Sequence, residues 1–434
     1  MRIKIEQGGV RIFRYDFDSY TLYEIKKRNV YSVKIRVILK EQVDGAVLQL
    51  SAPKAFRRFP YYCRTAALNR EGAYILEPSD KPIAVIKGYC AVRLGTEETN
   101  GLFFAVTYEN NSIFFSFAHN FCGACGAMRW IKATLWQYLT DRGYAVDRAG
   151  IMTTDTPITA EEQAEPDVAS LPVGNALGKL HFTRDSFVPM DDYIARMRDP
   201  NGIDGYYPVR ISKNTLMKYA HDNDGSPNSI LAAVLFKMCV KAVPDGRKFT
   251  VGITNNYRAD VGCPDTYRDM VRQMYVQYEI GMKDWSIEKL STVTRSRMYI
   301  QMQPEISWDK CRAVAELRRQ IDLQPDIESK VDYAAANSLT TNGLPSSFHI
   351  SYVGKVEWGG LGPFIDGVYT VTFAHLMFEV NATDEDFCIS FQTVRRDDKY
   401  LKEFLQVLDE EKIPYSVGAL EDRKLPEIIL PPFD

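Results

Sequence analysis

Two adjacent strand-forming runs that end at a histidine constrain the fold of this chain more than any other feature. The runs at 101–108 and 112–117 are rich in aromatic and β-branched residues, and a pair of asparagines between them is a turn signal. Residues 127–141 then place apolar side chains at helical spacing. We therefore predict a lobe that mixes strands with helices, with His119 at a strand–helix junction, a common location for chemistry.

The rest of the chain alternates in the same way, which predicts an α/β protein with a second lobe. The elements expected there are a strand near 209–211, helices at 212–221 and 226–243, a strand at 248–255, helices within 286–326, strands at 346–354, 368–380 and 386–394, and a helix at 398–412. The stretch 145–208 is weakly periodic and rich in turn-forming and acidic residues, so we expect it to cross between lobes. The predicted lobes are 1–190 and 191–434.

Composition narrows the class of protein. The chain has 434 residues, with 53 Lys and Arg against 56 Asp and Glu, and this near-neutral balance gives no support for binding nucleic acid or an anionic membrane. It has no run of 18 apolar residues and no apolar segment at its start, so we expect no membrane span and a cytoplasmic location. The glycines at 359–362 lack the context of a phosphate loop, which argues against a kinase, a GTPase or a dinucleotide enzyme.

Only five histidines can supply a base that titrates near neutral pH. His119 is the leading candidate, and the alternative is a vestigial residue or one that only contacts a ligand. His349 would share a strand face with Ser351, and either could contact substrate, Ser351 as a hydroxyl donor to a developing oxyanion. We expect His375 to be a partnered core residue, which is also the simpler interpretation of His349. His181 and His221 are expected at the surface.

Cys122 and Cys125 form the only Cys-x-x-Cys among eight cysteines. A chain of this length without a signal sequence is expected to keep its thiols reduced. The pair could be redox-active, half of a metal site, or a nucleophile beside His119. A zinc site needs two more ligands, and no second pair supplies them, so we expect no metal. Small residues packing a tight loop are the simplest interpretation.

Several segments together resemble a known superfamily. His119 and the residues to Met128 stand where that family has His-x-x-x-Asp-Gly followed by a helix, 254–258 resembles its Val-Asn-x-Arg, and 351–354 resembles its Ser-Asn-x-Gly. Further similar segments are 59–61, 74–78, 100–103, 208–212, 226–235 and 391–414. The family contains chloramphenicol acetyltransferase, alcohol acetyltransferases and the condensation domains of nonribosomal peptide synthetases. The resemblance is closest to bacterial alcohol acetyltransferases and covers nearly the whole chain.

The resemblance implies two related lobes arranged in a V, with a tunnel in which acyl donor and acceptor meet. It implies acyl transfer from a thioester, on coenzyme A or a carrier protein, to an alcohol or amine of a small molecule. His119 would be the general base that removes the acceptor's proton. No resident cofactor is implied, a carrier protein is a possible partner, and we expect a monomer because lone chains of this type close the tunnel themselves.

This chain departs from the motif at an important position. The family's Asp falls on Gly123, although that Asp braces the loop through an arginine and sets the geometry of the histidine. Arg64 and Arg258 are the candidates for that arginine. The departure motivates an alternative, a catalytically degenerate member that binds a ligand or a biosynthetic partner. The residues expected to contact substrate are Cys122, Gly123, Asn255, Arg258, His349 and Ser351.

Overall fold

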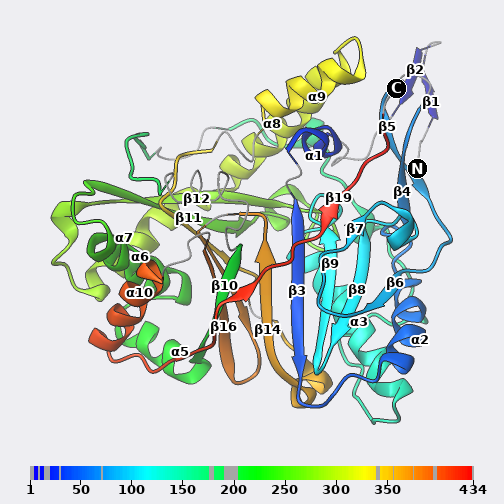
Figure 1. The fold of residues 1–434 in the computed structure, drawn as a ribbon. Helices are drawn as coiled ribbons and strands as arrows, with labels where there is room; N and C mark the ends of the chain where they lie inside the picture. The colour runs from blue at the N-terminus through cyan, green and yellow to red at the C-terminus, as the bar shows by residue number, and fades with distance from the viewer. Residues whose placement is uncertain are drawn as a thin grey trace.

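Two large β-sheets, one per lobe, organise the molecule (Figure 1), and the described residues also form three two-stranded sheets, β1-β2, β4-β5 and β7-β19. The computed structural model describes residues 4–7, 10–13, 20–28, 31–69, 72–174, 180–189, 204–338, 343–354, 356–374, 376–393 and 398–432. The lobe boundary predicted at 190–191 falls outside these residues. Within them, no helix is long and apolar enough to cross a membrane.

The first sheet has five strands in the order β14-β3-β9-β8-β6. Its strands and the helices packed with it in one core are β3 (Ser32–Leu39), β6 (Ala84–Lys87), β8 (Phe104–Glu109), β9 (Ser112–Ala118), β14 (Ile365–Thr372), α2 (Gly45–Phe56) and α3 (Ala124–Asp141). The hairpin predicted from the sequence is β8–β9. Its aromatic side chains are buried, and Phe104 and Phe115 meet the Trp130 ring of α3 edge-on at 5.4 and 5.1 Å between centroids.

The second sheet has eight strands, in the order β12-β11-β13-β15-β16-β10-β17, with β18 also paired to β10. Its longer strands and its covering helices are β10 (Gly205–Ser212), β11 (Lys248–Asn256), β12 (Val271–Glu279), β13 (Phe348–Tyr352), β15 (Met377–Ala382), β16 (Asp386–Thr393), α5 (Lys213–Asp222), α6 (Pro227–Ala242), α7 (Ile287–Gln301) and α10 (Lys399–Glu410). Alternation along these strands places apolar residues under the helices. The opposite face carries polar side chains.

The single strand predicted over 368–380 is wrong, because the structure divides this range between the two sheets. β14 ends at Thr372 after pairing with β3, and β15 begins at Met377 in the second sheet. Leu376 in the connection has a left-handed φ of 50°. Continuous alternation in a sequence does not show a change of sheet, so this crossover was not visible. The predicted helix at 127–141 also begins earlier, at Ala124.

The crossover strand β14 joins the two lobes directly. The Thr372 backbone N–H donates to Gln392 Oε1 at 2.9 Å, and Thr370 and Asn381 exchange side-chain hydrogen bonds. Gln392 and Asn381 belong to strands of the second sheet and are buried. The polar face of the second sheet therefore turns toward the first lobe at the end of β14.

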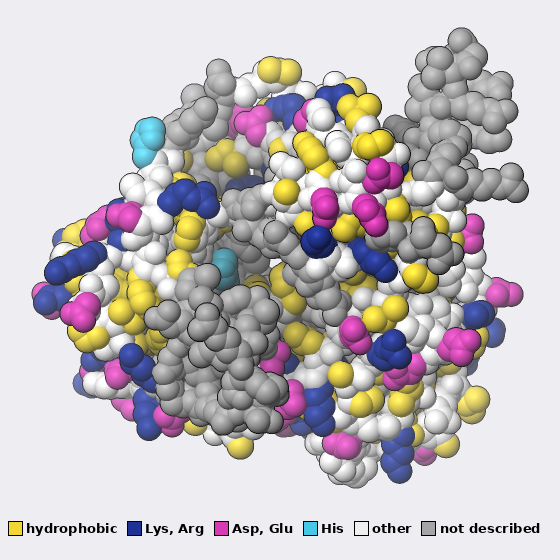
Figure 2. All heavy atoms as spheres, turned by 45° about the horizontal axis from the view of Figure 1, so that its top comes forward, with side chains coloured by type: hydrophobic (Ala, Val, Ile, Leu, Met, Phe, Trp, Pro, Cys, Tyr) yellow, Lys and Arg dark blue, Asp and Glu magenta, His cyan; other side chains and the backbone are white. Residues whose placement is uncertain are grey.

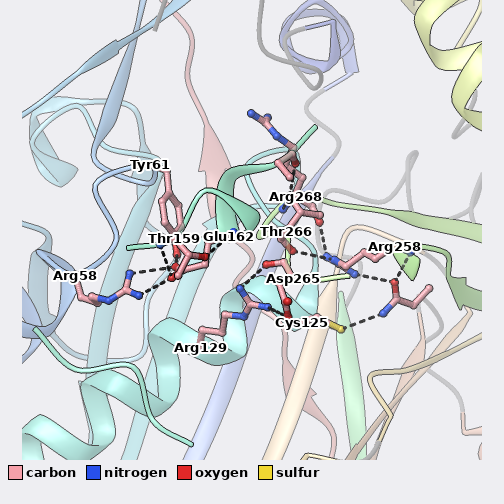
Figure 3. A network of polar contacts seen from close by, with 12 residues as sticks. Arg58, Tyr61, Cys125, Arg129, Thr159, Glu162, Arg258, Asp265, Thr266 and Arg268 are labelled. Atoms are coloured by element: carbon pink, nitrogen blue, oxygen red, sulfur yellow. Dashed lines mark hydrogen bonds and ion pairs between the residues drawn. The ribbon is translucent and has the colours of Figure 1, made fainter. Parts of the chain in front are cut away.

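The segment predicted to cross between lobes has no α-helix or strand in 146–174 and 180–189, but its last described part, 204–208, already belongs to β10 (Gly205–Ser212). It contains two short 3-10 helices, η2 (Glu161–Gln163) and η3 (Val168–Ser170). Glu162 is buried in an ion pair with Arg58, with 2.6 Å between Oε1 and Nη2 (Figure 3). This pair fastens the crossing segment to the first lobe.

The C-terminal segment runs back over both lobes (Figure 1, red). It pairs with the second sheet through β17 (Ser416–Val417) and β18 (Glu421–Asp422), and with β7 (Arg93–Leu94) through β19 (Glu427–Ile428). The remaining elements are β1 (Lys4–Gln7), β2 (Val10–Phe13), β4 (Arg64–Leu68), β5 (Tyr74–Pro78), α1 (Thr21–Arg28), α8 (Pro304–Asp322), α9 (Ile327–Ala336), η1 (Glu97–Thr99), η4 (Ala259–Val261), η5 (Ile280–Met282) and η6 (Gly359–Phe364). On the face shown in Figure 2, acidic and basic side chains are interspersed.

Candidate active site

His119 follows the last residue of β9, and the local backbone holds it there. Its N–H donates to the carbonyl of Tyr31 at 2.7 Å, which continues the pairing of β9 with β3 by one residue. Its side chain is 25 % exposed, while the preceding Ala118 is fully buried. The end of β9 therefore places the imidazole at the edge of the first lobe that faces the second lobe.

A carboxylate from the second lobe meets this imidazole. Asp269, in the loop before β12, places Oδ2 3.2 Å from His119 Nδ1. Burial alone would lower the pKa of His119, but the charge of Asp269 and its hydrogen bond outweigh burial and raise that pKa above the ordinary value. A proton held on Nδ1 by a carboxylate leaves the other ring nitrogen, Nε2, as the acceptor. The two lobes together thus build a histidine–aspartate pair.

Gly123 explains how Asp269 reaches this position. Gly123 is the N-cap of α3, and a Cβ built on it would lie 2.8 Å from Asp269 Oδ1 and 3.1 Å from Arg258 Nη2. Any side chain here would press on that carboxylate, so the carboxylate occupies space that the glycine leaves open. The N-terminal end of a helix also favours a negative charge. A carboxylate from the second lobe therefore occupies the space beside Gly123.

Arg258, one of the two arginines expected to brace the loop, lies beside Gly123. Its guanidinium donates to the Thr266 carbonyl at 3.1 Å, to Asn256 Oδ1 at 3.1 Å and to the Arg268 carbonyl (Figure 3). It is 3 % exposed. These bonds shape the loop 256–268 that leads to Asp269, so the structure gives Arg258 a positioning contact, and its predicted contact with substrate stays a prediction.

Three polar side chains of the second sheet face the same side. His349 and Ser351 are two residues apart in β13 and so point to the same face of the sheet, and Ser351 is in register with Glu379 of β15. Burial lowers the pKa of His349 to about 4, so its ring is neutral at physiological pH. A Cβ on Gly252 would lie 2.5 Å from His349 Nδ1, so the ring lies across that glycine of β11. The predicted shared face of His349 and Ser351 is confirmed.

Glu379 is buried, with 3 % of its surface exposed. Burial raises the pKa of its carboxyl to about 7, and the Ser351 hydroxyl, the charge of His119 and the Thr372 hydroxyl partly oppose that shift. The charge of Glu379 in turn helps to raise the pKa of His119. Two carboxyl groups therefore raise the pKa of His119, Asp269 from the loop before β12 and Glu379 from β15.

The two cysteines of the Cys-x-x-Cys occupy different environments. Cys122 is fully buried, and its thiol interacts with the buried Tyr62 hydroxyl. Cys125 is half-buried in the first turn of α3, and its sulfur lies 3.8 Å from Asn256 Nδ2. Neither cysteine is in a disulfide, and the part of the chain that the structure describes holds no group of three or more His, Cys, Asp or Glu able to bind a metal. Cys122 is placed to pack the loop.

A pocket of about 280 Å³ opens between the lobes on the Cys125 side of α3. Its walls include Arg129 and Lys132 of α3 and Val353, Val356 and Glu357 beyond β13. Asn255, the next-to-last residue of β11, is half-buried and in register with Arg272 rather than on this wall. Of the other histidines, His181 and His221 are exposed as expected, and His375 falls outside the described residues.

Sequence reasoning missed Asp269 and Glu379. Asp269 carried no signal, because only folding brings the loop before β12 to the end of β9. Glu379 carried one, since a carboxylate within the apolar run of β15 is costly to bury without a partner or a role.

Comparison with known proteins supports the fold. No family model matches this sequence, and no curated protein matches it significantly. Among solved structures, F. graminearum TRI101 complexed with coenzyme A and T-2 mycotoxin superposes with a TM-score of 0.59 at 12 % identity, over 92 % of this chain and 98 % of TRI101. Polyketide synthase associated protein 5 from Mycobacterium tuberculosis gives 0.57 at 12 % identity, over 91 % and 98 %. The first condensation domain of the calcium-dependent antibiotic synthetase gives 0.55 at 11 % identity, over 92 % and 95 %.

The chain therefore has the fold of these three solved structures. The α/β fold with two lobes that the sequence resemblance implied is confirmed.

Proposed function

We propose that this protein transfers an acyl group from a thioester to an alcohol or amine of a small molecule, with His119 as the general base. The observation that carries the proposal is the 3.2 Å contact between His119 Nδ1 and Asp269 Oδ2 at the meeting of the two lobes. A base needs a fixed tautomer and a fixed direction, and this contact supplies both. TRI101 and the condensation domain, which share the fold, support thioester chemistry.

In the proposed reaction, the acceptor's hydroxyl or amine donates its proton to His119 Nε2 as it attacks the thioester carbonyl. The carbon–sulfur bond then breaks, and the imidazolium returns the proton to the leaving thiolate. Asp269 stabilises the imidazolium formed between these steps, since a carboxylate at Nδ1 favours the charged ring. The donor, coenzyme A or a carrier protein, is a substrate and not a resident cofactor.

The alternative, a degenerate member that binds a ligand or partner without turnover, was motivated by Gly123. Because Asp269 brings a carboxylate to the same place, we favour the enzyme. That the protein is of the bacterial alcohol acetyltransferase type, cytoplasmic and monomeric stays a prediction, as do the lobe limits 1–190 and 191–434 and substrate contacts by Cys122, Gly123, Asn255, Arg258, His349 and Ser351.

Thioester turnover tests the proposal. Purified protein is offered a panel of acyl-coenzyme A donors with pooled small alcohols and amines, and free thiol and product mass are followed. We expect thiol release that depends on the acceptor and a product heavier by the acyl group. A second panel uses acyl groups on a carrier protein. Absence of acceptor-dependent release from both donor classes would favour the binding alternative.

The pH dependence of the rate follows from the Asp269 contact. The neutral form of His119 is the active base, and Asp269 raises the pKa of His119, so kcat/KM should fall as pH drops through a value above the ordinary 6.5. Asp269→Asn removes the charge, and we expect the midpoint of the acid limb to move to lower pH while the maximal rate falls. A midpoint that is unchanged in Asp269→Asn would contradict the assigned role of Asp269.

A paired exchange of residues tests the replacement of the motif aspartate. Gly123→Asp alone should lower the rate by about 100-fold. Its Cβ would lie 2.8 Å from Asp269 Oδ1 and would push the Asp269 carboxylate away, and a misplacement of about 1 Å in a catalytic site can cost that factor. Adding Asp269→Gly removes the crowding and the second charge, so the double variant should recover at least about 10-fold over Gly123→Asp. The backbone at Gly123 (φ −77°, ψ 172°) accepts any residue, so strain does not confuse the result. A rise in activity with Gly123→Asp alone would show that the replacement is misassigned.

A further inference from the structure

We propose that Glu379 forms a subsite that binds the ammonium group of an amine acceptor beside His119. The inference rests on the proposed function, because it selects the acceptor class for the same site. It is carried by the position of Glu379 in the second sheet, by its hydrogen-bond partners and by the charges around it.

Glu379 lies on a central strand of the second sheet, with polar side chains beside it on both neighbouring strands. It lies on β15 between β13 and β16, in register with Ser351 on one neighbour and Ser390 on the other. Residues in register share a face, so the carboxyl lies between two hydroxyl-bearing side chains. The Ser390 hydroxyl is fully buried and has no hydrogen-bond partner among the described residues. This hydroxyl is therefore available to hydrogen-bond a molecule bound beside Glu379.

The partners of Glu379 connect it to the base. Its carboxyl interacts with the hydroxyls of Ser351 and Thr372, and its charge interacts with that of His119. Thr372 is the last residue of β14, and it pairs with Val33 of β3, which in turn pairs with Phe117 of β9, two residues before His119. The second sheet therefore brings Glu379, and the first sheet brings His119, to one region between the lobes.

The carboxyl of Glu379 is not neutralised by an ion pair within the described residues. In the described part of the chain, no Lys or Arg makes an ion pair with Glu379. Arg423 is buried nearby, but its guanidinium donates to the Thr372 and Ala374 carbonyls at 2.6 and 2.8 Å and pairs with Asp204. Burial holds the pKa of Glu379 at about 7, so the carboxyl is poised between its two forms, and an ammonium group would favour the ionised one.

An amine that binds as its ammonium form at Glu379 can be acylated in a reaction in which each proton has an acceptor. One ammonium proton passes to the Glu379 carboxylate and is later released to solvent. The free amine attacks the thioester carbonyl, and the carbon–nitrogen bond forms as the carbon–sulfur bond breaks. The second proton moves through His119 to the leaving thiolate. The products are an amide, a thiol and one proton, so atoms and charge balance.

Matched amines and alcohols test this subsite. Binding of 2-phenylethylamine and 2-phenylethanol, and of n-hexylamine and n-hexanol, is measured by calorimetry on the His119→Ala protein, which lacks the base. We expect each amine to bind more tightly than its alcohol. Adding Glu379→Gln, which keeps the shape, should weaken the amines by at least about 10-fold and change the alcohols by less than about 2-fold. Glu288→Gln, an exposed site on α7, is the matched control and should change neither.

Two results would overturn the subsite. One is equal binding of amines and alcohols, measured before Glu379 is changed and therefore independent of how the variant folds. The other is equal weakening of both classes by Glu379→Gln. Glu379→Asp keeps the charge and should retain part of the amine preference. Because the binding arm needs no turnover, amine binding that depends on Glu379 in a protein without acyl transfer would sustain the subsite while refuting the proposed function.

Discussion

Replacing His119 by alanine is expected to lower the rate of acyl transfer by about 10²- to 10⁴-fold, the range that a positioned general base contributes. The acceptor would then have to lose its proton to water while it attacks the thioester. The Asp269 carboxylate would remain, with its side chain 26 % exposed and without its imidazole partner. The measurement is kcat/KM with the best donor and acceptor of the turnover panel.

The matched control is His221→Ala. His221 has a side chain that is 89 % exposed at the end of α5, so its loss should leave the rate unchanged. A His119→Ala protein that retains more than about a tenth of the wild-type rate would remove His119 from the role of base. A His119→Ala protein that is inactive but still binds acceptor would support that role, since the fold and the binding surface would then be intact.

Removing the buried cation Arg58 is expected to lower the free energy of unfolding by about 3–5 kcal/mol, because it leaves Glu162 buried without a counter-charge. Arg58 and Glu162 are each 3 % exposed. The guanidinium donates to both carboxylate oxygens at 3.1 and 2.6 Å, and the Tyr61 hydroxyl donates to the same carboxylate at 3.0 Å (Figure 3). The Tyr267 N–H donates to the Glu162 carbonyl at 2.9 Å. This network ties the crossing segment to the first lobe and to the loop that carries Asp269.

Chemical denaturation of wild type and Arg58→Ala as a function of pH tests this prediction. Burial would raise the pKa of Glu162, but the bonds from Arg58 and Tyr61 outweigh it and hold that pKa below 4.5. A lowered folded-state pKa means that the stabilisation is present above the unfolded value and is lost as pH falls through the folded value. The difference between wild type and Arg58→Ala should therefore shrink in acid.

An exposed ion pair provides the comparison for that experiment. Arg148 and Asp155 lie 2.7 Å apart with side chains 62 % and 64 % exposed, and Arg148→Ala should leave stability nearly unchanged. If Arg58→Ala were no more destabilising than Arg148→Ala, the buried network would not be what holds the crossing segment in place.

Much of the fold could be predicted because its signals are local. The hairpin of β8 and β9, the helix that follows it and the position of His119 between them all follow from residues close together in the chain. Ser226 and Pro227 predicted the start of α6, and the structure shows a full capping box there. The resemblance in several ordered segments then indicated two lobes, which no single element could.

The residues of the candidate site also fall into those that local sequence signals predict and those that only folding brings together. His119 and the shared face of His349 and Ser351 could be predicted, because strand periodicity determines which way neighbouring side chains point. Gly123 could be recognised as a departure, but its consequence could not, since a missing side chain does not say what fills the space. Asp269 fills it from a loop that is distant in sequence.

The sequence by itself therefore determined the secondary structure around His119 and the class of fold, and it pointed to His119 as the histidine that we propose as the base. Only the tertiary structure decided which groups surround that base. It divided 368–380 between two sheets, set Glu379 beside the end of the first sheet and seated Asp269 against Gly123. The physical reason is range: periodicity, capping and turn chemistry act over a few residues, whereas the charges that tune a buried imidazole act through space and come from whichever strands and loops folding brings near.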